Sequence, residues 1–158
     1  QFLDGDGISF RPLGGDITRA AAIKMCYAAM TKGTMTLHTA VLTVGEILGI
    51  SDELQAEFLD SQKFHWDLMN KRVPFYAADA GRWAGEMDQI SQTFNDTGVS
   101  GNLHRGAADI FRLLDASPLG KETRESLDKN RTLDQAVKIF ADTARSNMNH
   151  KKDDKYGT

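Results

Sequence analysis

The feature that most constrains the fold is a long stretch without proline, which runs from Ile17 to Leu48 and is rich in Ala, Met, Leu and Lys. Proline disrupts helices and these four residue types favour them, so the stretch predicts one helix of about 32 residues, roughly 48 Å long. Asp16 is placed to cap its start and Gly49 to end it. Because this helix exceeds the average length several-fold, we expect it to be the spine of the fold.

The rest of the chain also has helical signals. Ser51 is placed to cap a helix from Asp52, and Thr132 to Gln135 form a capping-box pattern that starts another. No pair of strands is evident, although residues 8–13 alternate somewhat like a short strand. We therefore predict an all-α fold of about six or seven helices around the long N-terminal one. The further predicted helices cover residues 52 onward, 64–69, 76–94, 100–114 and 132–146, and a short one begins at 117–118.

A chain of 158 residues is expected to form one domain, which we place at residues 16–146. The opening segment begins at Gln1 in what reads as the middle of a sequence element, so residues 1–15 are interpreted as the remnant of an interdomain segment. The charge-rich residues 147–158 are predicted to be a flexible tail.

Charge and composition argue against several partners. The net charge is −3 and the basic residues are scattered, which disfavours nucleic acid and anionic membranes as partners. No apolar window reaches the roughly 18 residues of a membrane span. The single cysteine, Cys26, cannot form an internal disulfide and fits a reduced, cytoplasmic protein.

Motifs for metals and nucleotides are missing from the sequence. The four histidines are far apart and lack the spacing of a helical metal site, so we expect no metal. Neither residues 4–7 nor Gly14-Gly15 have the strand–turn–helix context of a dinucleotide-binding fingerprint.

Lys24 is the strongest candidate for chemistry. It is the only charged residue from Ala20 to Met30, a stretch whose small side chains imply close packing around the helix. Desolvation disfavours the charged form of a lysine, which is the usual way to make it a general acid or base near neutral pH. The alternative is that Lys24 extends to the surface or pairs with one buried carboxylate, and the residues alone favour that alternative.

Other side chains could line the same pocket. Tyr27 and Thr31 lie on the helix face of Lys24, although Tyr27 could be a core aromatic and Thr31 could bond its own backbone. Lys32 could add a second cation for an anionic substrate, or could be an ordinary exposed lysine. On the 76–94 helix Trp83 and Glu86 could face the cavity, although a core role for Trp83 and a solvated Glu86 are more common.

Two blocks of sequence resemble a known family. The first is residues 15–48, centred on the segment Lys24 to Gly33, and the second is Arg82 to Ile90 followed by Gly98-Val99. The first block is similar to the start of the C-terminal helical domain of β-hydroxyacid dehydrogenases. More narrowly, the chain resembles the 6-phosphogluconate dehydrogenase C-terminal-like branch, the DUF1932 domain, over most of residues 8–145.

The resemblance implies a function. In that family a Rossmann domain binds NAD or NADP, and a lysine on the long helix acts as general acid/base on a hydroxy acid. The matching position is Lys24, with Tyr27, Thr31, Lys32 and Trp83 on the substrate side. Glu86 stands where the family has a cofactor contact. Ala28 replaces the family's asparagine, so substrate anchoring is expected to differ.

The sequence therefore leads to an expectation with alternatives. The leading one is the substrate-binding and dimerisation domain of an NAD(P)-dependent oxidoreductase, inactive without its cofactor domain, which binds no cofactor itself. The second is a helical dimerisation or interaction module that has lost catalysis, and the third is an unrelated helical binding domain. A homodimer is expected, because a spine with many small residues packs well against another helix.

Overall fold

The computed structural model describes Gly14, Asp16 and residues 18–156. The described residues form six α-helices and two 3-10 helices and contain no strand, which confirms the predicted all-α class. The strand-like segment 8–13 and most of the proposed interdomain remnant 1–15 lie outside the described residues. In chain order the elements are α1 (Thr18–Leu48), α2 (Ser51–Ser61), α3 (Lys63–Arg72), η1 (Val73–Phe75), α4 (Ala77–Asp96), α5 (Asn102–Ala116), η2 (Pro118–Lys121) and α6 (Leu133–Tyr156).

The long helix α1 begins and ends as its sequence predicts. The Asp16 carboxylate accepts a hydrogen bond from the Thr18 backbone N–H at 2.8 Å, which caps the first turn. At the other end Gly49 has φ +70°, a left-handed conformation that favours glycine. The Ile50 N–H then donates to the Gly45 carbonyl at 3.0 Å, so the last carbonyls of the helix are satisfied.

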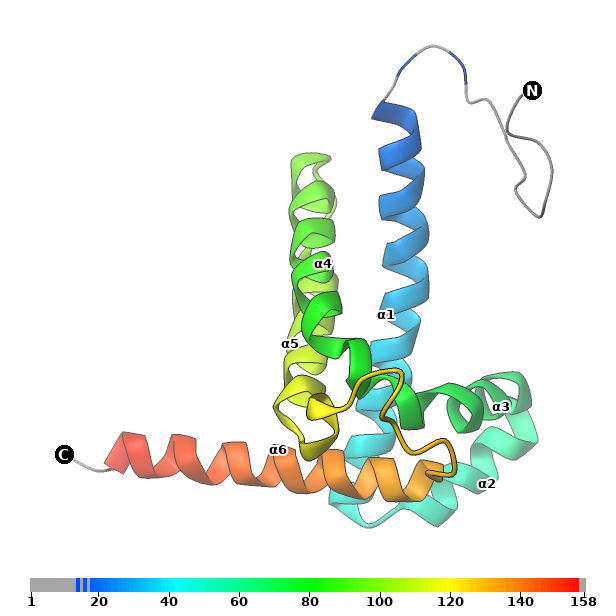
Figure 1. Cartoon of the computed structure of the whole chain (residues 1–158), viewed down its shortest axis with the longest axis vertical. Helices are drawn as coiled ribbons and strands as arrows, with labels where there is room; N and C mark the ends of the chain where they lie inside the picture. Colours follow the sequence, from blue (N-terminus) through cyan, green and yellow to red (C-terminus); the bar gives the residue numbers. More distant parts are fainter. Residues whose placement is uncertain (1–13, 15, 17, 157–158) are drawn as a thin grey trace.

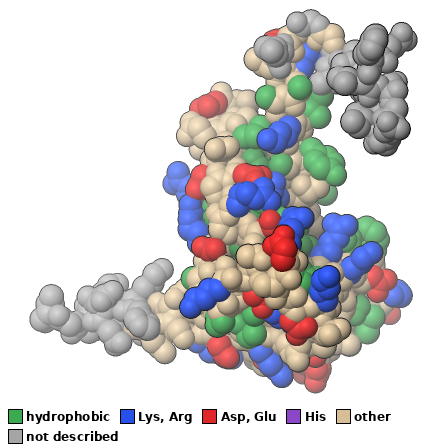
Figure 2. All heavy atoms as spheres, viewed as in Figure 1, with side chains coloured by type: hydrophobic (Ala, Val, Ile, Leu, Met, Phe, Trp, Pro, Cys, Tyr) green, Lys and Arg blue, Asp and Glu red, His purple; other side chains and the backbone are tan. Residues whose placement is uncertain are grey.

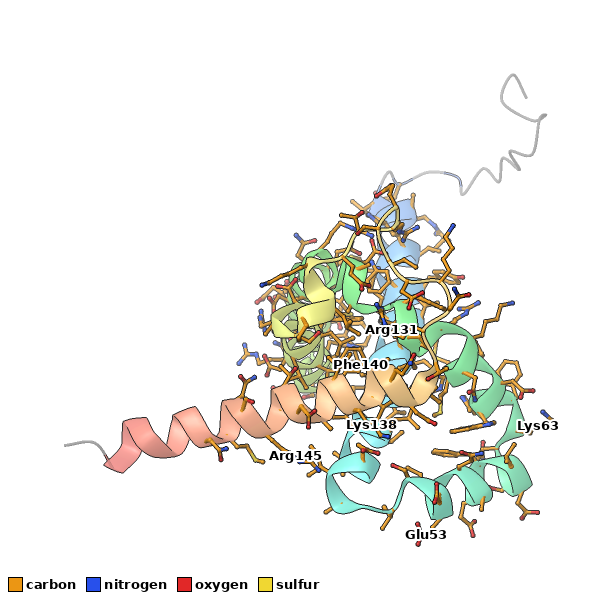
Figure 3. All side chains as sticks on the ribbon, turned by 60° about the horizontal axis from the view of Figure 1, so that its bottom comes forward. Glu53, Lys63, Arg131, Lys138, Phe140 and Arg145 are labelled. Atoms are coloured by element: carbon orange, nitrogen blue, oxygen red, sulfur yellow. The ribbon has the colours of Figure 1, made fainter. Side chains whose placement is uncertain are left out.

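The other helices pack around one side of α1. Figure 1 shows α4 and α5 as a hairpin beside α1, with α6 crossing the base and α2 and α3 folded near its lower end. Small residues let α4 and α5 approach closely, since Ala80 and Ala108 are fully buried. Phe140 is also fully buried and anchors α6 (Figure 3) to this body. The largest fully buried side chains are Phe111, Phe140, Met69, Met87, Ile90, Leu114 and Val73.

Of the two other predicted helix caps, one is confirmed. At the start of α6 the Thr132 N–H donates to Gln135 Oε1 at 2.9 Å and the Gln135 N–H donates to Thr132 Oγ1 at 3.3 Å, a reciprocal capping box. The other prediction was wrong. Ile50 precedes the first turn of α2 and makes no side-chain cap, while Ser51 Oγ donates instead to Glu46 Oε2 at 2.8 Å.

Two element boundaries also differ from the prediction. Helix α3 runs to Arg72, past its predicted end at Met69, and the chain then continues as the 3-10 helix η1 from Val73 to Phe75. This is possible because proline fits the first positions of a helical turn, where its missing N–H is not needed. In addition, α6 does not end near Ser146 but continues as helix to Tyr156, so the segment proposed as a tail is largely helical. In the described part of the chain, no helix has the length and apolar character to cross a membrane.

Candidate functional site

The first half of α1 carries Lys24 and is exposed. Lys24 is exposed, as are Ala20 and Ala22, while Tyr27 keeps 71% of its surface and Met30 72%. Among the described residues, the expected close packing around Lys24 is therefore absent. The reason is geometric, because among the described elements α4 and α5 approach only one side of this half of the helix (Figure 1).

An ion-pair cluster lies below Lys24, where α1 meets α4. Lys32 Nζ lies 2.6 Å from Glu86 Oε2, and Arg82 Nη1 lies 2.6 Å from Glu86 Oε1. The hydrogen bond from Lys32 is the main cause that lowers the pKa of Glu86; burial opposes it, and the charges of Lys32, Arg82 and Lys24 lower the pKa further. Lys24 is thus close enough to act electrostatically on Glu86.

The cluster extends along α4 into the loop before α6. Arg82 pairs with Asp79 at 3.1 Å, and Asp79 pairs with Arg124 at 2.7 Å. Burial alone would raise the pKa of Asp79, but the hydrogen bonds and charges of Arg124 and Arg82 outweigh it and lower the pKa. Our sequence reasoning missed Asp79 and Arg82. Asp79 and Arg82 are three residues apart, and Arg82 and Glu86 are four apart. Residues at these spacings are neighbours on one face of a helix, so the sequence could have indicated the ion pairs.

Three of the six predicted site residues do not join this cluster. Thr31 Oγ1 donates to the Tyr27 carbonyl at 3.0 Å, which is the backbone role considered for it from sequence. The Trp83 ring packs against Phe111 at 5.4 Å and Tyr76 at 6.1 Å between centroids, so it serves the core. The structure therefore pairs Lys32 with Glu86 and keeps Lys24 near enough to act on that carboxylate. Trp83 meets the cluster only through Arg82, whose guanidinium carbon lies 5.8 Å from the centroid of the indole ring.

The residue expected to contact a cofactor, Glu86, is engaged by a cation on each of its two carboxylate oxygens. Its contact with a dinucleotide stays a prediction. Within the described ranges no group of three or more His, Cys, Asp or Glu side chains is arranged to hold a metal ion.

A second feature is an apolar groove of about 690 Å³ between α1 and α5. Met30 and Leu37 from α1 and Leu103 from α5 line it and are 61–75% exposed. Its two walls come from segments more than sixty residues apart, so no local pattern in the sequence could have indicated it. The other lining residues are Cys26, Ala29, Gly33, Thr34, Thr36, Ala40, Phe94, Asn102, His104, Gly106, Ala107 and Ile110.

Two histidines are buried in the described chain, His38 on α1 and His104 on α5. His38 Nε2 lies 2.9 Å from Nδ1 of His65 on α3, and the His104 ring lies 4.2 Å from that of Phe94. The pKa of His38 is lowered by burial and then by the charge of His65, and the pKa of His104 is lowered by burial. Both imidazoles are therefore suited to the neutral state.

Comparison with known families gives a partial match. A family model described as a domain of unknown function (DUF1932) matches residues 46–114. This range runs from the end of α1 through most of α5, and so includes Glu86 but not Lys24 or Lys32. Comparison with curated proteins and with solved structures found no match. Residues 46–114 of this all-helical chain are thus similar to the DUF1932 domain.

Proposed function

We propose that this chain is the helical substrate-binding and association domain of an NAD(P)-dependent oxidoreductase of the β-hydroxyacid dehydrogenase type. Lys24 would be its proton-transfer residue, and it would hold or release a proton at the hydroxyl or carbonyl oxygen of the substrate. The observation that carries the proposal is the position of Lys24. It stands on the uncovered half of α1, beside the Lys32–Glu86 pair and among apolar side chains that a further domain would cover.

The surroundings of Lys24 support both parts of this role. Ile23 is 53% exposed and Tyr27 71% exposed, so a domain that packs on them would also withdraw water from the lysine. Lys24 and the cluster residues Lys32, Arg82 and Arg124 bring four positive charges against the two negative charges of Glu86 and Asp79. The surplus of positive charge favours an anionic substrate, such as a small hydroxy acid.

The cofactor would be held mainly by a Rossmann domain, because this sequence has no dinucleotide-binding fingerprint. This requirement makes the proposal easy to test from the gene. A strand, a glycine-rich turn and a helix should be encoded upstream of Gln1. Their absence would contradict the oxidoreductase and favour the non-catalytic association module instead.

The decisive experiment uses the protein with its natural upstream sequence. Lys24→Met should abolish turnover of a hydroxy acid and leave NAD or NADP binding unchanged, because only the proton carrier is removed. Lys63→Met is a matched control, since the Lys63 side chain is 67% exposed on α3 and pairs only with Asp67 among the described residues. Unchanged turnover in the Lys24 variant would refute the assignment.

A non-catalytic association module is the second candidate. The exposed apolar surface of α1 and the groove beside α5 favour it, since exposed apolar patches of this kind mark association sites. This candidate predicts that no hydroxy acid is turned over, with or without Lys24, while the chain still self-associates.

A further inference from the structure

The groove between α1 and α5 has the size and lining of a small-molecule site. Its volume of about 690 Å³ lies within the range of about 300–1,000 Å³ that is usual for ligand sites. Along α1 its lining runs from Cys26 to Ala40, about 21 Å at 1.5 Å per residue. Hydrophobic side chains reach the surface along the upper part of this helix (Figure 2). The groove is therefore long and apolar, a shape that suits an extended chain.

Two glycines leave open space on the two walls of the groove. Gly33 on α1 and Gly106 on α5 both line it, and a Cβ added at either position would meet nothing within 4 Å. Neither glycine has a positive φ, so neither is needed for the course of the backbone. Close packing against the described residues does not require them either. They leave room for a bound molecule to approach both helix backbones.

His104 gives this apolar groove a buried polar group without a partner. The side chain lines the groove and is only 5% exposed, and the centroid of its ring lies 4.2 Å from that of Phe94. Its Nδ1 atom has no hydrogen-bond partner among the described residues. A buried nitrogen without a hydrogen bond is costly, so it calls for a physical explanation. A molecule bound in the groove, with a hydrogen-bonding group beside the ring, would supply one.

We propose that the groove is a binding site for an uncharged aliphatic molecule with one hydroxyl group, whose chain lies along α1 and whose hydroxyl bonds the ring of His104. No charged residue lines the groove, so a carboxylate or an ammonium group bound there would lack a counter-charge. A hydroxyl both donates and accepts hydrogen bonds, and therefore matches either tautomer of a neutral imidazole. Long-chain alcohols have this chemistry.

The groove is separate from the site of Lys24. Successive residues of an α-helix are turned by about 100°, so Gly33, nine residues after Lys24, stands on the opposite side of α1. The ligand site therefore goes beyond the proposed oxidoreductase role and does not depend on it. Its tests measure binding and not turnover, so either proposal can fail while the other stands.

Amide chemical shifts of the whole chain, measured by NMR, test the class of ligand. Added 1-decanol should give saturable shifts in residues 26–40 and 102–110, which include the two walls of the groove. Decanoate, which is ionised at about pH 8, should bind about ten-fold more weakly or less, because its charge loses water without gaining a partner. No saturable shift with 1-decanol, or equal affinity for decanoate, would overturn the proposal. Shifts of these amides that follow protein concentration without added ligand would identify a second copy as the occupant and also overturn it.

Substitution of the glycines tests the location. Gly33→Met should weaken the binding of 1-decanol by about ten-fold or more, because the added side chain has open space to occupy within the groove. Gly85→Met is the matched control. A Cβ at Gly85 also meets nothing within 4 Å, but this residue is on α4 and does not line the groove. Equal affinity for 1-decanol in the two variants, with unchanged circular dichroism, would overturn the site.

Substitution of the histidine tests the polar contact. His104→Phe keeps a ring against Phe94 but cannot bond a hydroxyl, so it should raise the dissociation constant of 1-decanol by about 3- to 10-fold. Binding of decanoate should change less, because the carboxylate is not expected to gain from this contact. An unchanged affinity for 1-decanol in a folded His104→Phe variant would overturn the placement of the hydroxyl at His104.

Discussion

Acidification should destabilise this fold through its two buried histidines. His38 is 4% exposed and His104 5% exposed, and within the described residues Nδ1 of each ring lacks a hydrogen-bond partner. Their pKa values are lowered in the folded chain, so the unfolded chain binds protons first, from about pH 6.5 downward. The free energy of unfolding is therefore unaffected by the histidines above about pH 7.5, and it decreases as the pH falls through 6.5 toward each lowered pKa.

The size of the loss follows from proton linkage. Each proton taken up only by the unfolded chain costs about 1.4 kcal/mol per pH unit, so both histidines together remove at most about 3 kcal/mol between about pH 7.5 and 5.5. Asp79 and Glu86 also have lowered pKa values, but the stability that these two carboxylates contribute is lost only below about pH 4.5.

Urea unfolding at fixed protein concentration measures the free energy of unfolding at each pH. His104→Phe, which keeps a ring against Phe94, should remove about half of the loss. A free energy of unfolding that stays constant over this range, or a loss unchanged in the variant, would refute the reasoning.

Urea unfolding also tests the caps and the glycines. Thr132→Ala should cost about 1 kcal/mol because it breaks the capping box, whereas Ser51→Ala should change stability by less than about 0.5 kcal/mol; equal effects would contradict the observed caps. Gly101→Ala should cost more than about 2 kcal/mol, because the added Cβ would lie 2.2 Å from the Ser91 carbonyl oxygen. Gly85→Ala should instead stabilise α4 by about 0.5–1 kcal/mol, because nothing lies within 4 Å of the added Cβ, and the opposite ranking would argue against this packing.

The parts of the fold that depend on neighbouring residues were predictable. The bounds of α1 follow from the missing prolines, the Asp16 cap and the positive φ of Gly49, all of which act within a few residues. The end of α6 was not predicted, because the charged segment after Ser146 resembles a tail in composition. No proline or glycine interrupts it before Gly157, so nothing in that segment prevents the helix from continuing.

The candidate site was less predictable, because burial depends on what packs against a residue. The apolar neighbours of Lys24 suggested a desolvated lysine, yet in the described chain they form an exposed surface. Lys32 and Glu86 lie more than fifty residues apart in the sequence, which indicated both residues but could not indicate their contact. Trp83 and Thr31 had been given structural alternatives, and the structure shows those roles for both.

The central claim is that a further domain covers the exposed half of α1 beside Lys24, and amide hydrogen exchange tests it most directly. An isolated helical segment of about 12 residues is only marginally stable in water, so residues 19–30 need a covering partner to stay protected. We predict weak protection of these amides in residues 1–158 alone and strong protection when the natural upstream sequence is restored, while the amides around Met87 and Phe111 in the α4–α5 core stay protected in both proteins. Rapid exchange of residues 19–30 in the longer protein would contradict the claim.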